Sequence, residues 1–175
     1  MSEEPFDAIV AAHHGEIYRF LRRTTGRVSD ADDLSQETFL RAFRAYPSLP
    51  PDANVRAWLF AIATNLCRNH FRSEKRRRKA LAVVEADGRG AEAGGPEGET
   101  LFNEARSRVE AMVSRLPVKQ RLAFTLRKLH DQDYETVGRM LDCSAESARA
   151  HVFQAFRKIR GLLNGEDLAR AEARR

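Results

Sequence analysis

The sequence is poor in cysteine and has no long run of apolar residues. Its two cysteines, Cys67 and Cys143, lie far apart and in no metal-ligand spacing, so neither a disulfide framework nor a zinc site is indicated. No uninterrupted apolar stretch approaches the length needed to cross a bilayer, and the acidic opening MSEEPFDAIV does not resemble a secretory signal. We therefore expect a cytoplasmic protein, in a reducing compartment, with no insertion into a membrane.

Motifs that carry catalysis are also missing from the sequence. The five histidines form no ligand pair at helical spacing, and there is no nucleophile elbow, zinc-protease motif or phosphate-binding loop. The stretch GRGAEAGG follows no predicted strand and has the wrong spacing for a phosphate loop. We expect no metal, no cofactor and no enzymatic activity.

The charged residues are distributed unevenly along the chain. Lys and Arg number 30 and Asp and Glu number 25, which gives a net charge of +5. Residues 68–79 contain seven basic side chains and one acid, whereas residues 85–104 contain six acids and one arginine. A phosphate backbone attracts the first segment and repels the second. The basic run is expected to contact nucleic acid, and a solvated charged arm is the alternative.

Apolar residues recur at helical spacing through most of the chain, and no segment alternates convincingly as a strand does. The pattern predicts one helix from Phe6 to a stop at Gly26, and a second near Ser29, whose spacing to Asp32 resembles a capping box. After the proline-rich loop 47–54, a third helix is expected to begin near Val55. The expected inner faces comprise Phe6, Ile9, Val10, His13, Ile17, Phe20 and Leu21 in the first helix, Leu34, Thr38, Ala42, Phe43 and Tyr46 in the second, and Val55, Trp58, Leu59, Ile62 and Leu66 in the third.

The second half of the chain predicts a helix-turn-helix. Residues DYETVGRML, DCS and AESARAHVFQAFRKIRGLL indicate a helix, a tight turn and a longer helix, with Asp133 and Ser144 as N-caps. Upstream, Ala105, Val109, Met112, Val113 and Leu116 are expected to form one apolar stripe, and Pro117 to start the following helix. In the last helix the expected inner face comprises Ala148, Val152, Ala155 or Phe156, Ile159 and Leu163.

These patterns predict an all-α protein of two small helical domains joined by a flexible linker. Glycines and acids concentrate in the expected linker. The expected divisions are a first domain at 1–79, the linker at 80–99, a second domain at 100–165 and a charged tail at 166–175.

Two segments carry residues suited to nucleic acid. A helix-turn-helix places the start of its second helix in the major groove, where Arg149 and Gln154 can meet base edges or phosphates and Phe153 a thymine methyl. An ordinary helical hairpin with a solvated charged face is the alternative. The third helix carries Asn65 and Asn69 ahead of the basic run, a mixture that can pair with and neutralise melted DNA.

Three segments, in order, resemble the extracytoplasmic-function (ECF) sigma factors of bacteria. DADDLSQETFLRAFRAY, residues 30–46, resembles the helix that docks on the clamp of RNA polymerase. VRAWLFAIATNLCRNHFRSEKRR, residues 55–77, resembles the promoter-melting and minus-ten segment, and residues 116–160 are similar to region four of the family. The resemblance implies an initiation factor that binds core RNA polymerase and promoter DNA. Members of the family are commonly bound by an anti-sigma factor, so such a partner is also expected.

The resemblance also implies which residues bind each partner. The residues expected to dock on polymerase are Asp33, Leu34, Gln36, Glu37 and Phe39. Those expected to contact the melted minus-ten strand are Trp58, Asn65, Arg68, Asn69, Arg72, Lys75 and Arg76, and loop 47–54 lies where the family holds a flipped base. Those expected to contact the minus-thirty-five duplex are Arg149, Ala150, His151, Phe153, Gln154, Arg157 and Lys158.

This chain departs from the family's pattern at two places. It keeps Arg149 but has Ala150 and His151 where the family often has Ser and Arg, and its loop lacks the Arg-Gly-Asp-type residues common in the family. The family's promoter sequences are therefore not carried over. Two other classes stay open: a stand-alone helix-turn-helix regulator with an N-terminal dimerisation domain, and a nucleic-acid-processing enzyme, for which no set of acids or histidines is visible.

Overall fold

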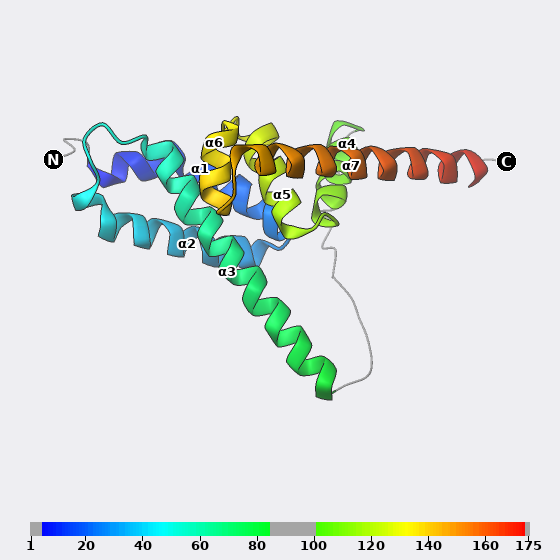
Figure 1. Ribbon diagram of the computed structural model, residues 1–175, viewed down its shortest axis with the longest axis horizontal. Coiled ribbons are helices and arrows are strands. Elements are labelled where there is room, and N and C mark those ends of the chain that lie inside the picture. The colour runs from blue at the N-terminus through cyan, green and yellow to red at the C-terminus, as the bar shows by residue number, and fades with distance from the viewer. Residues whose placement is uncertain (1–4, 85–100, 174–175) are drawn as a thin grey trace. The chain divides into compact units, whose positions relative to one another are not determined.

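The computed structural model describes the backbone of residues 5–84 and 101–173 and the side chains of residues 5–81 and 108–165. Over these residues the chain forms seven α-helices and no strand, which confirms the all-α prediction (Figure 1). The elements are α1 (Phe6–Thr25), α2 (Val28–Ala45), η1 (Tyr46–Ser48), α3 (Val55–Val84), α4 (Leu101–Ser114), α5 (Val118–Phe124), η2 (Thr125–Leu129), α6 (Tyr134–Leu141) and α7 (Ala145–Ala173). Two compact units result, the first containing α1–α3 and the second α4–α7.

The first unit is a three-helix bundle in which α1, α2 and α3 pack on one another. Phe20 of α1 and Phe60 of α3 meet edge to face, with ring centroids 5.4 Å apart, at the centre of its core. Helix α1 ends as predicted at Gly26, which adopts the left-handed conformation with φ 78°. The buried apolar residues are Ile9, Ile17, Phe20, Leu21, Ala31, Ala42, Leu59, Phe60, Ala63, Leu66 and Cys67.

Helix α2 differs from its prediction at its start and in one residue of its inner face. It begins at Val28, after an extended Arg27, so Ser29 lies inside the first turn and the predicted capping box is wrong. The N-cap position is occupied by Arg27, whose side chain makes no capping hydrogen bond. Phe43, predicted to face the core, is 61% exposed.

Small residues form the inner face of α2, and two of them, Thr38 and Ala42, are buried as predicted. The buried positions of this helix are Ala31, Ser35, Thr38 and Ala42, which follow one another at three- and four-residue steps. Their small side chains let the backbone of α2 lie close to its neighbours, and Phe43 falls one residue off this stripe. Its ring is therefore left on the surface.

The buried stripe of α3 is shifted from the predicted one. Leu59 and Leu66 are buried as expected, but Phe60, Ala63 and Cys67, which the prediction omitted, are buried as well. Val55, Trp58 and Ile62 are only partly buried. A helix covered on one side by both α1 and α2 buries a broader face than a single stripe.

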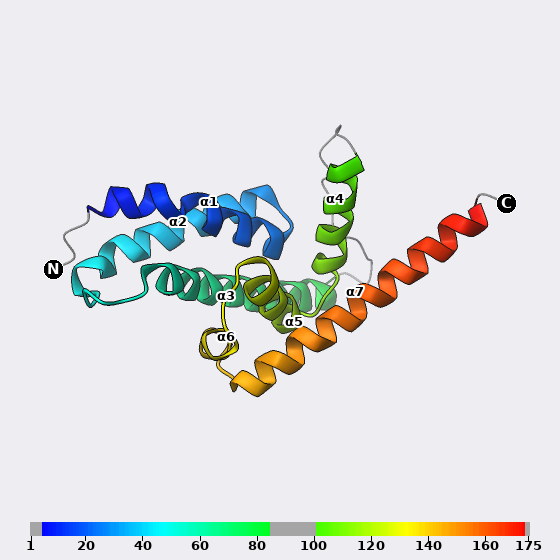
Figure 2. The ribbon, with the colours of Figure 1, turned by 90° about the horizontal axis from the view of Figure 1, so that it is seen from above.

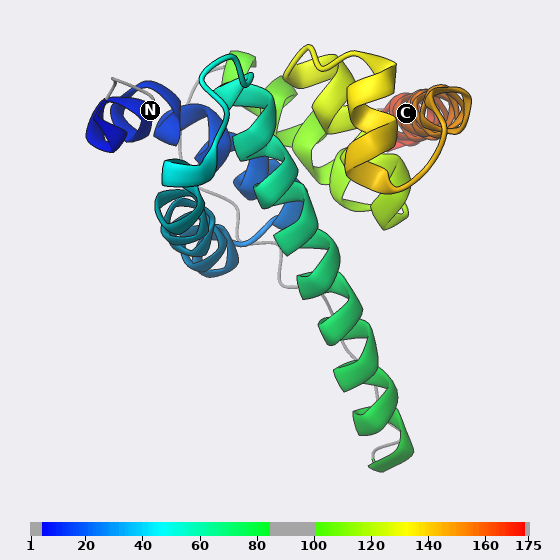
Figure 3. The same cartoon turned by 60° about the vertical axis from the view of Figure 1, so that its left-hand side comes forward.

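Helix α3 is longer than its packed part. It continues to Val84, so residues 80–84, which were predicted as linker, are helical, while residues 85–99 of that linker lie outside the described residues. Figures 1 and 3 show the C-terminal half of α3 extending beyond α1 and α2. Its side chains over residues 75–81 are exposed.

The second unit contains the predicted helix-turn-helix, α6 and α7. The Asp133 side chain accepts a 2.8 Å hydrogen bond from the Thr136 amide, and Ser144 Oγ accepts one of 3.1 Å from the Ser147 amide. Both predicted N-caps are thereby confirmed. Between the helices, Asp142 takes the left-handed conformation with φ 52°.

The core of this unit joins residues of α4, α5 and α7. Met112, Val113 and Leu116 are buried as predicted, whereas Val109 is partly exposed, and the side chain of Ala105 lies outside the described residues. On α7 the two alternatives are resolved, because Ala155 is buried and Phe156 is exposed. Pro117 is the N-cap of α5 rather than its first residue. Helix α7 runs on to Ala173, through most of the predicted tail (Figure 2).

Candidate functional site

Three surfaces carry the residues singled out by the sequence: a groove between α1 and α2, a polar strip along α3, and the outer face of α7. The groove, called here the α1–α2 groove, has a volume of about 530 Å³. Its floor includes Leu40 and Phe43, which are 43% and 61% exposed. The residues that line it are Phe6, Asp7, Val10, His14, Tyr18, Asp32, Ser35, Gln36, Phe39, Leu40 and Phe43. An open apolar surface rimmed by polar groups is typical of a site for another protein.

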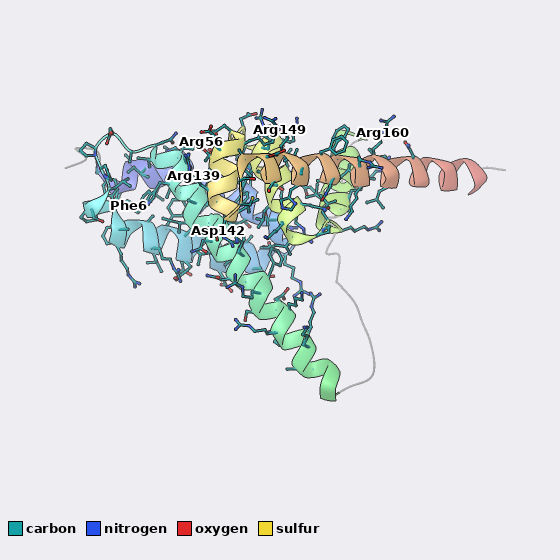
Figure 4. The ribbon with its side chains drawn as sticks, viewed as in Figure 1. Phe6, Arg56, Arg139, Asp142, Arg149 and Arg160 are labelled. Atoms are coloured by element: carbon teal, nitrogen blue, oxygen red, sulfur yellow. The ribbon has the colours of Figure 1, made fainter. Side chains whose placement is uncertain are left out.

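Aromatic contacts hold the walls of the α1–α2 groove. At one end, the ring of Phe6 lies edge-on to Phe43, with centroids 5.4 Å apart, and 5.5 Å from the ring of Tyr46 (Figure 4). Toward the other end, the Tyr18 hydroxyl donates a hydrogen bond to the Asp32 carboxylate, which raises the pKa of Tyr18. The groove therefore has an apolar end and a polar, negatively charged end.

The predicted polymerase-docking residues divide between the α1–α2 groove and the surface beside it. Gln36 and Phe39 line the groove. Asp33 is exposed next to it, Leu34 is half-buried, and Glu37 forms a 2.6 Å ion pair with Arg41.

Leu40 and Phe43 were not predicted to belong to this surface. Together with Gln36 and Phe39 they recur at steps of one, three and four, so all four share one side of α2. That spacing was the signal in the sequence. The same spacing also fits Phe43 to the core, so periodicity alone does not identify this surface.

The polar strip of α3, called here the α3 strip, contains every residue predicted to meet the melted strand. Asn65, Asn69, Arg72, Lys75 and Arg76 are exposed, whereas Trp58 and Arg68 are half-buried. Steps of three, four and seven residues place them along one side of the helix. Amides therefore lie beside the bundle, and cations follow along the projecting part of α3.

The opposite side of α3 is less positive. Glu74 lies 3.7 Å from the guanidinium of Arg77 and 3.5 Å from that of Arg78, so these two charges are partly neutralised. The positive charge that remains is concentrated on the α3 strip.

The proline-rich loop ahead of α3 is held by its own hydrogen bonds. Leu49 donates to the carbonyl of Tyr46 and Ala53 to that of Pro50, each at 3.0 Å. The Asn54 side chain then accepts a 2.9 Å bond from the Ala57 amide and caps α3. The loop is thereby fixed at the start of the helix that carries the α3 strip.

The outer face of α7, called here the α7 face, lies opposite the buried residues of that helix. Ala150, Phe153, Gln154 and Arg157 are exposed, and Phe153 is 62% exposed. Arg149, on one flank, and Lys158, on the other, are also exposed. Figure 4 shows Arg149 and Arg160 on the same side of α7. The residues predicted to read duplex DNA thus share a surface that the fold leaves uncovered.

Neighbouring helices hold two side chains of the α7 face in place. The guanidinium of Arg149 lies over the ring of Tyr134, 5.0 Å from its centroid, and that of Arg127 lies 5.1 Å from the same centroid. Gln154 accepts a 2.8 Å hydrogen bond from the side chain of Gln120. Sequence reasoning named neither Tyr134 nor Gln120, because no local pattern pairs them with α7.

His151 is the half-buried member of the α7 face. Burial, and to a lesser degree the charge of Lys119, lower its pKa from the ordinary value of 6.5. The imidazole therefore carries little charge at neutral pH. Its Nδ1 atom is buried without a hydrogen-bond partner, at a position where the family often has an arginine.

One group of metal-ligating residues lies in the part of the chain that the structure describes. Asp30, His70 and Glu74 each offer a ligand atom, all within 4.8 Å of one another, and His70 Nε2 lies 3.5 Å from the Asp30 carboxylate. Glu74 is already paired with two arginines. The cluster is accounted for by these side-chain contacts, which join the start of α2 to α3. None of the described helices combines the length and apolar character of a membrane span.

Comparison with known proteins assigns both units. Residues 9–77 match the family described as Sigma-70 region 2, and residues 106–159 match Sigma-70, region 4. The ECF RNA polymerase sigma-E factor of Escherichia coli (strain K12) is 29% identical over 160 residues, covering 87% of this chain and 83% of the relative. The protein of the same name from Haemophilus influenzae is 27% identical over 160 residues, covering 87% and 84%.

Two solved structures share the fold. The sigma factor RpoE, in complex with the anti-sigma factor NepR from Bartonella quintana, has a TM-score of 0.74 at 23% identity, covering 91% of this chain and 96% of that one. CnrH, in complex with the cytosolic domain of CnrY, has a TM-score of 0.66 at 22% identity, covering 91% and 88%.

The order of the matches decides between the functions left open by the sequence. The region 2 match includes the α3 strip and all of α2, where a stand-alone regulator would need only a dimerisation domain, so that alternative is not favoured. The region 4 match includes the helix-turn-helix. The expected partners, core RNA polymerase and promoter DNA, follow from these two regions. The chain belongs to the sigma-70 family and is an ECF sigma factor, an alternative initiation factor for bacterial RNA polymerase.

Proposed function

We propose that the three surfaces divide the work of promoter recognition and polymerase binding among them. The α7 face reads the minus-thirty-five duplex, the α3 strip holds the melted minus-ten strand, and the α1–α2 groove docks a partner protein. The observation that carries this division is the contrast between the two DNA surfaces. The α7 face has an apolar ring and a neutral imidazole among its cations, whereas the α3 strip passes from amides to cations.

The two DNA surfaces suit different forms of DNA. A helix that presents Phe153 and Gln154 between cations fits a major groove, where base edges offer methyl groups and hydrogen-bond partners. A strip on which Asn65 and Asn69 adjoin arginines suits single-stranded bases and their phosphates. Flipping a base costs a few kcal/mol of unstacking, so contacts made only with the open strand shift the duplex toward melting.

The α1–α2 groove is the surface we assign to protein partners. Polymerase binding would use the groove residues Gln36 and Phe39, together with Asp33, Leu34 and Glu37 beside them. Its apolar floor and acidic end complement a helix with apolar and basic residues.

We propose that an anti-sigma factor controls this chain by covering the same groove. Of the two solved structures named above, one holds the sigma factor RpoE in complex with the anti-sigma factor NepR, and the other holds CnrH in complex with the cytosolic domain of CnrY. Competition for one groove would keep the factor from polymerase until the inhibitor is released. A pull-down from the source cell, repeated with Phe43→Asp, identifies this partner: the variant should lose the inhibitor and bind core polymerase less tightly.

We further propose that the protein performs no chemistry of its own and acts in the cytoplasm, at the nucleoid. Phosphate neutralisation places it on DNA, base contacts select the promoter, and trapped bases stabilise the open complex. Binding energy is then its whole mechanism.

Two variants test the division of the DNA surfaces. Arg149→Ala should weaken binding to a minus-thirty-five duplex, because a well-formed arginine–base pair contributes about 1–3 kcal/mol, or roughly 5- to 150-fold in affinity. Asn65→Ala should leave duplex binding unchanged and reduce promoter melting by the holoenzyme. Fluorescence anisotropy measures the first step and permanganate footprinting the second.

A matched control separates base reading from loss of charge. Arg160 lies on the same side of α7, three turns beyond Arg149, and Arg160→Ala removes one positive charge from the helix without touching the predicted readers. It should lower affinity slightly and equally for all sequences. If Arg149→Ala and Asn65→Ala each lost duplex binding and promoter melting to the same extent, the proposed division of roles between the α7 face and the α3 strip would be wrong.

A further inference from the structure

Two arginines of the second unit share one aromatic ring. Tyr134 is the first residue of α6, and the guanidinium groups of Arg127 and Arg149 lie 5.1 and 5.0 Å from the centroid of its ring. Arg127 belongs to the π-helical turn η2, and Arg149 to the first turns of α7. The ring therefore connects α6, η2 and α7 through one cation–π contact with Arg127 and another with Arg149.

The position of Tyr134 is fixed by its neighbours in sequence. Asp133 accepts hydrogen bonds of 2.8 Å from both the amide and the hydroxyl of Thr136, and this cap orders the first turn of α6. The same two bonds lower the pKa of Asp133, so the cap stays ionised well below neutral pH. Tyr134 itself is half-buried and presents its ring to both cations.

The arginines have no acidic partner among the residues that the structure describes. Neither Arg127 nor Arg149 forms an ion pair there, and the buried Nε of Arg127 has no hydrogen-bond partner. A carboxylate would have occupied the N–H groups of Arg149, whereas the ring contact, with 5.0 Å between the guanidinium carbon and the ring centroid, places no acidic oxygen on them. The N–H donors of Arg149 therefore remain available.

We propose that Tyr134 is a positioning residue that sets Arg149 for guanine. A guanidinium restrained beside a ring presents two parallel N–H groups, and these match the O6 and N7 acceptors of guanine in the major groove. Restraint before binding also reduces the side-chain freedom that an arginine loses on contact. Arg127, on the same ring, adds a second cation that favours the nearby phosphates. This inference rests on the proposed role of Arg149 in reading duplex DNA.

The test compares Tyr134→Leu with Tyr134→Phe in the full chain. Each variant is titrated against duplexes in which every minus-thirty-five position carries each of the four base pairs in turn. Wild type and Tyr134→Phe should prefer guanine at one position by about 10-fold or more, as expected for a bidentate contact. In Tyr134→Leu this preference should fall several-fold, while affinity for unrelated duplex changes much less.

A second readout reports on the restraint without DNA. The Nε–H proton of Arg149 should show an upfield ring-current shift in the NMR spectra of wild type and Tyr134→Phe, and lose it in Tyr134→Leu. Thermal unfolding checks that the variants are folded. If Tyr134→Leu unfolds, Tyr134→Met takes its place, because it also removes the ring and should lose both the shift and the preference.

The outcomes separate this inference from the function on which it rests. If Arg149→Ala loses the guanine preference and Tyr134→Leu keeps it, the positioning role is wrong and the proposed function stands. If Arg149→Ala leaves every base preference unchanged, the assigned reader itself is wrong. If Tyr134→Phe loses as much preference as Tyr134→Leu, the hydroxyl rather than the ring face is responsible, and the inference is overturned.

Discussion

Replacing Gly138 by alanine should destabilise the second unit, because α6 lies against the turn that leads into α7. A Cβ at this position would lie 2.7 Å from the carbonyl oxygen of Cys143, and 3.1 Å from both the amide nitrogen of Ala145 and the carbonyl carbon of Ser144. All three are backbone atoms, so the turn itself must move. Overpacking costs about 1–3 kcal/mol, and a backbone clash this close belongs at the upper end. Alanine's better helix propensity offsets about 1 kcal/mol, which leaves a net loss of about 2 kcal/mol.

Gly161 provides the matched control for this substitution. It lies within α7, and a Cβ added there would meet nothing within 4 Å. Only helix propensity then acts, so Gly161→Ala should stabilise the same unit by about 0.5–1 kcal/mol.

Urea unfolding distinguishes the two units in the full chain. Trp58 is the single tryptophan and lies in the first unit, so its fluorescence reports that unit, whereas circular dichroism reports both. Gly138→Ala should move the dichroism transition and weaken duplex binding while leaving the tryptophan transition in place. A Gly138→Ala protein as stable as wild type, beside the expected gain in Gly161→Ala, would refute the reasoning.

Three smaller perturbations test other contacts. Asp133→Ala should lower the unfolding free energy of the second unit by about 1 kcal/mol, whereas Asp133→Asn, which can still cap α6, should cost less; equal losses would contradict the cap. Because burial lowers the pKa of His151 below 6.5, the unfolded state binds its proton first as pH falls, so stability should decline below about pH 6.5. In urea titrations at several pH values, His151→Gln should reduce the fall of the unfolding free energy with decreasing pH. An unchanged pH dependence in this variant would contradict the role of His151. Arg56 donates to Glu16 through two nitrogens, one bond measuring 2.9 Å, and a double-mutant cycle should give about 0.5–1 kcal/mol that shrinks in high salt.

Local signals in the sequence predicted the helices and several of their ends. A left-handed glycine at the end of α1, and the Asp133 and Ser144 caps, depend on residues only a few positions apart. The inner face of α2 could not be read in this way. Its periodicity placed both Ala42 and Phe43 on the inner face, whereas the closely packed helix buries only the small Ala42.

The sequence predicted the surfaces that lie on a single helix better than the surface that two helices form together. The α3 strip and the α7 face each lie on one helix, so spacing along the sequence brought their members together. The α1–α2 groove needs two helices, and its floor residue Leu40 was not foreseen. The contact of Tyr134 with Arg149 and that of Gln120 with Gln154 join different helices, and no periodic pattern encodes such pairs.

Promoter-specific run-off transcription tests the central claim most directly. Purified chain is added to core RNA polymerase, with no other sigma factor present, on a library of genomic promoters. We predict transcripts from a subset of promoters, which depend on both the minus-thirty-five and minus-ten sequences and are reduced by Arg149→Ala and Asn65→Ala. Duplex binding by the chain alone, with no transcript from any promoter in the library, would contradict its role as an initiation factor.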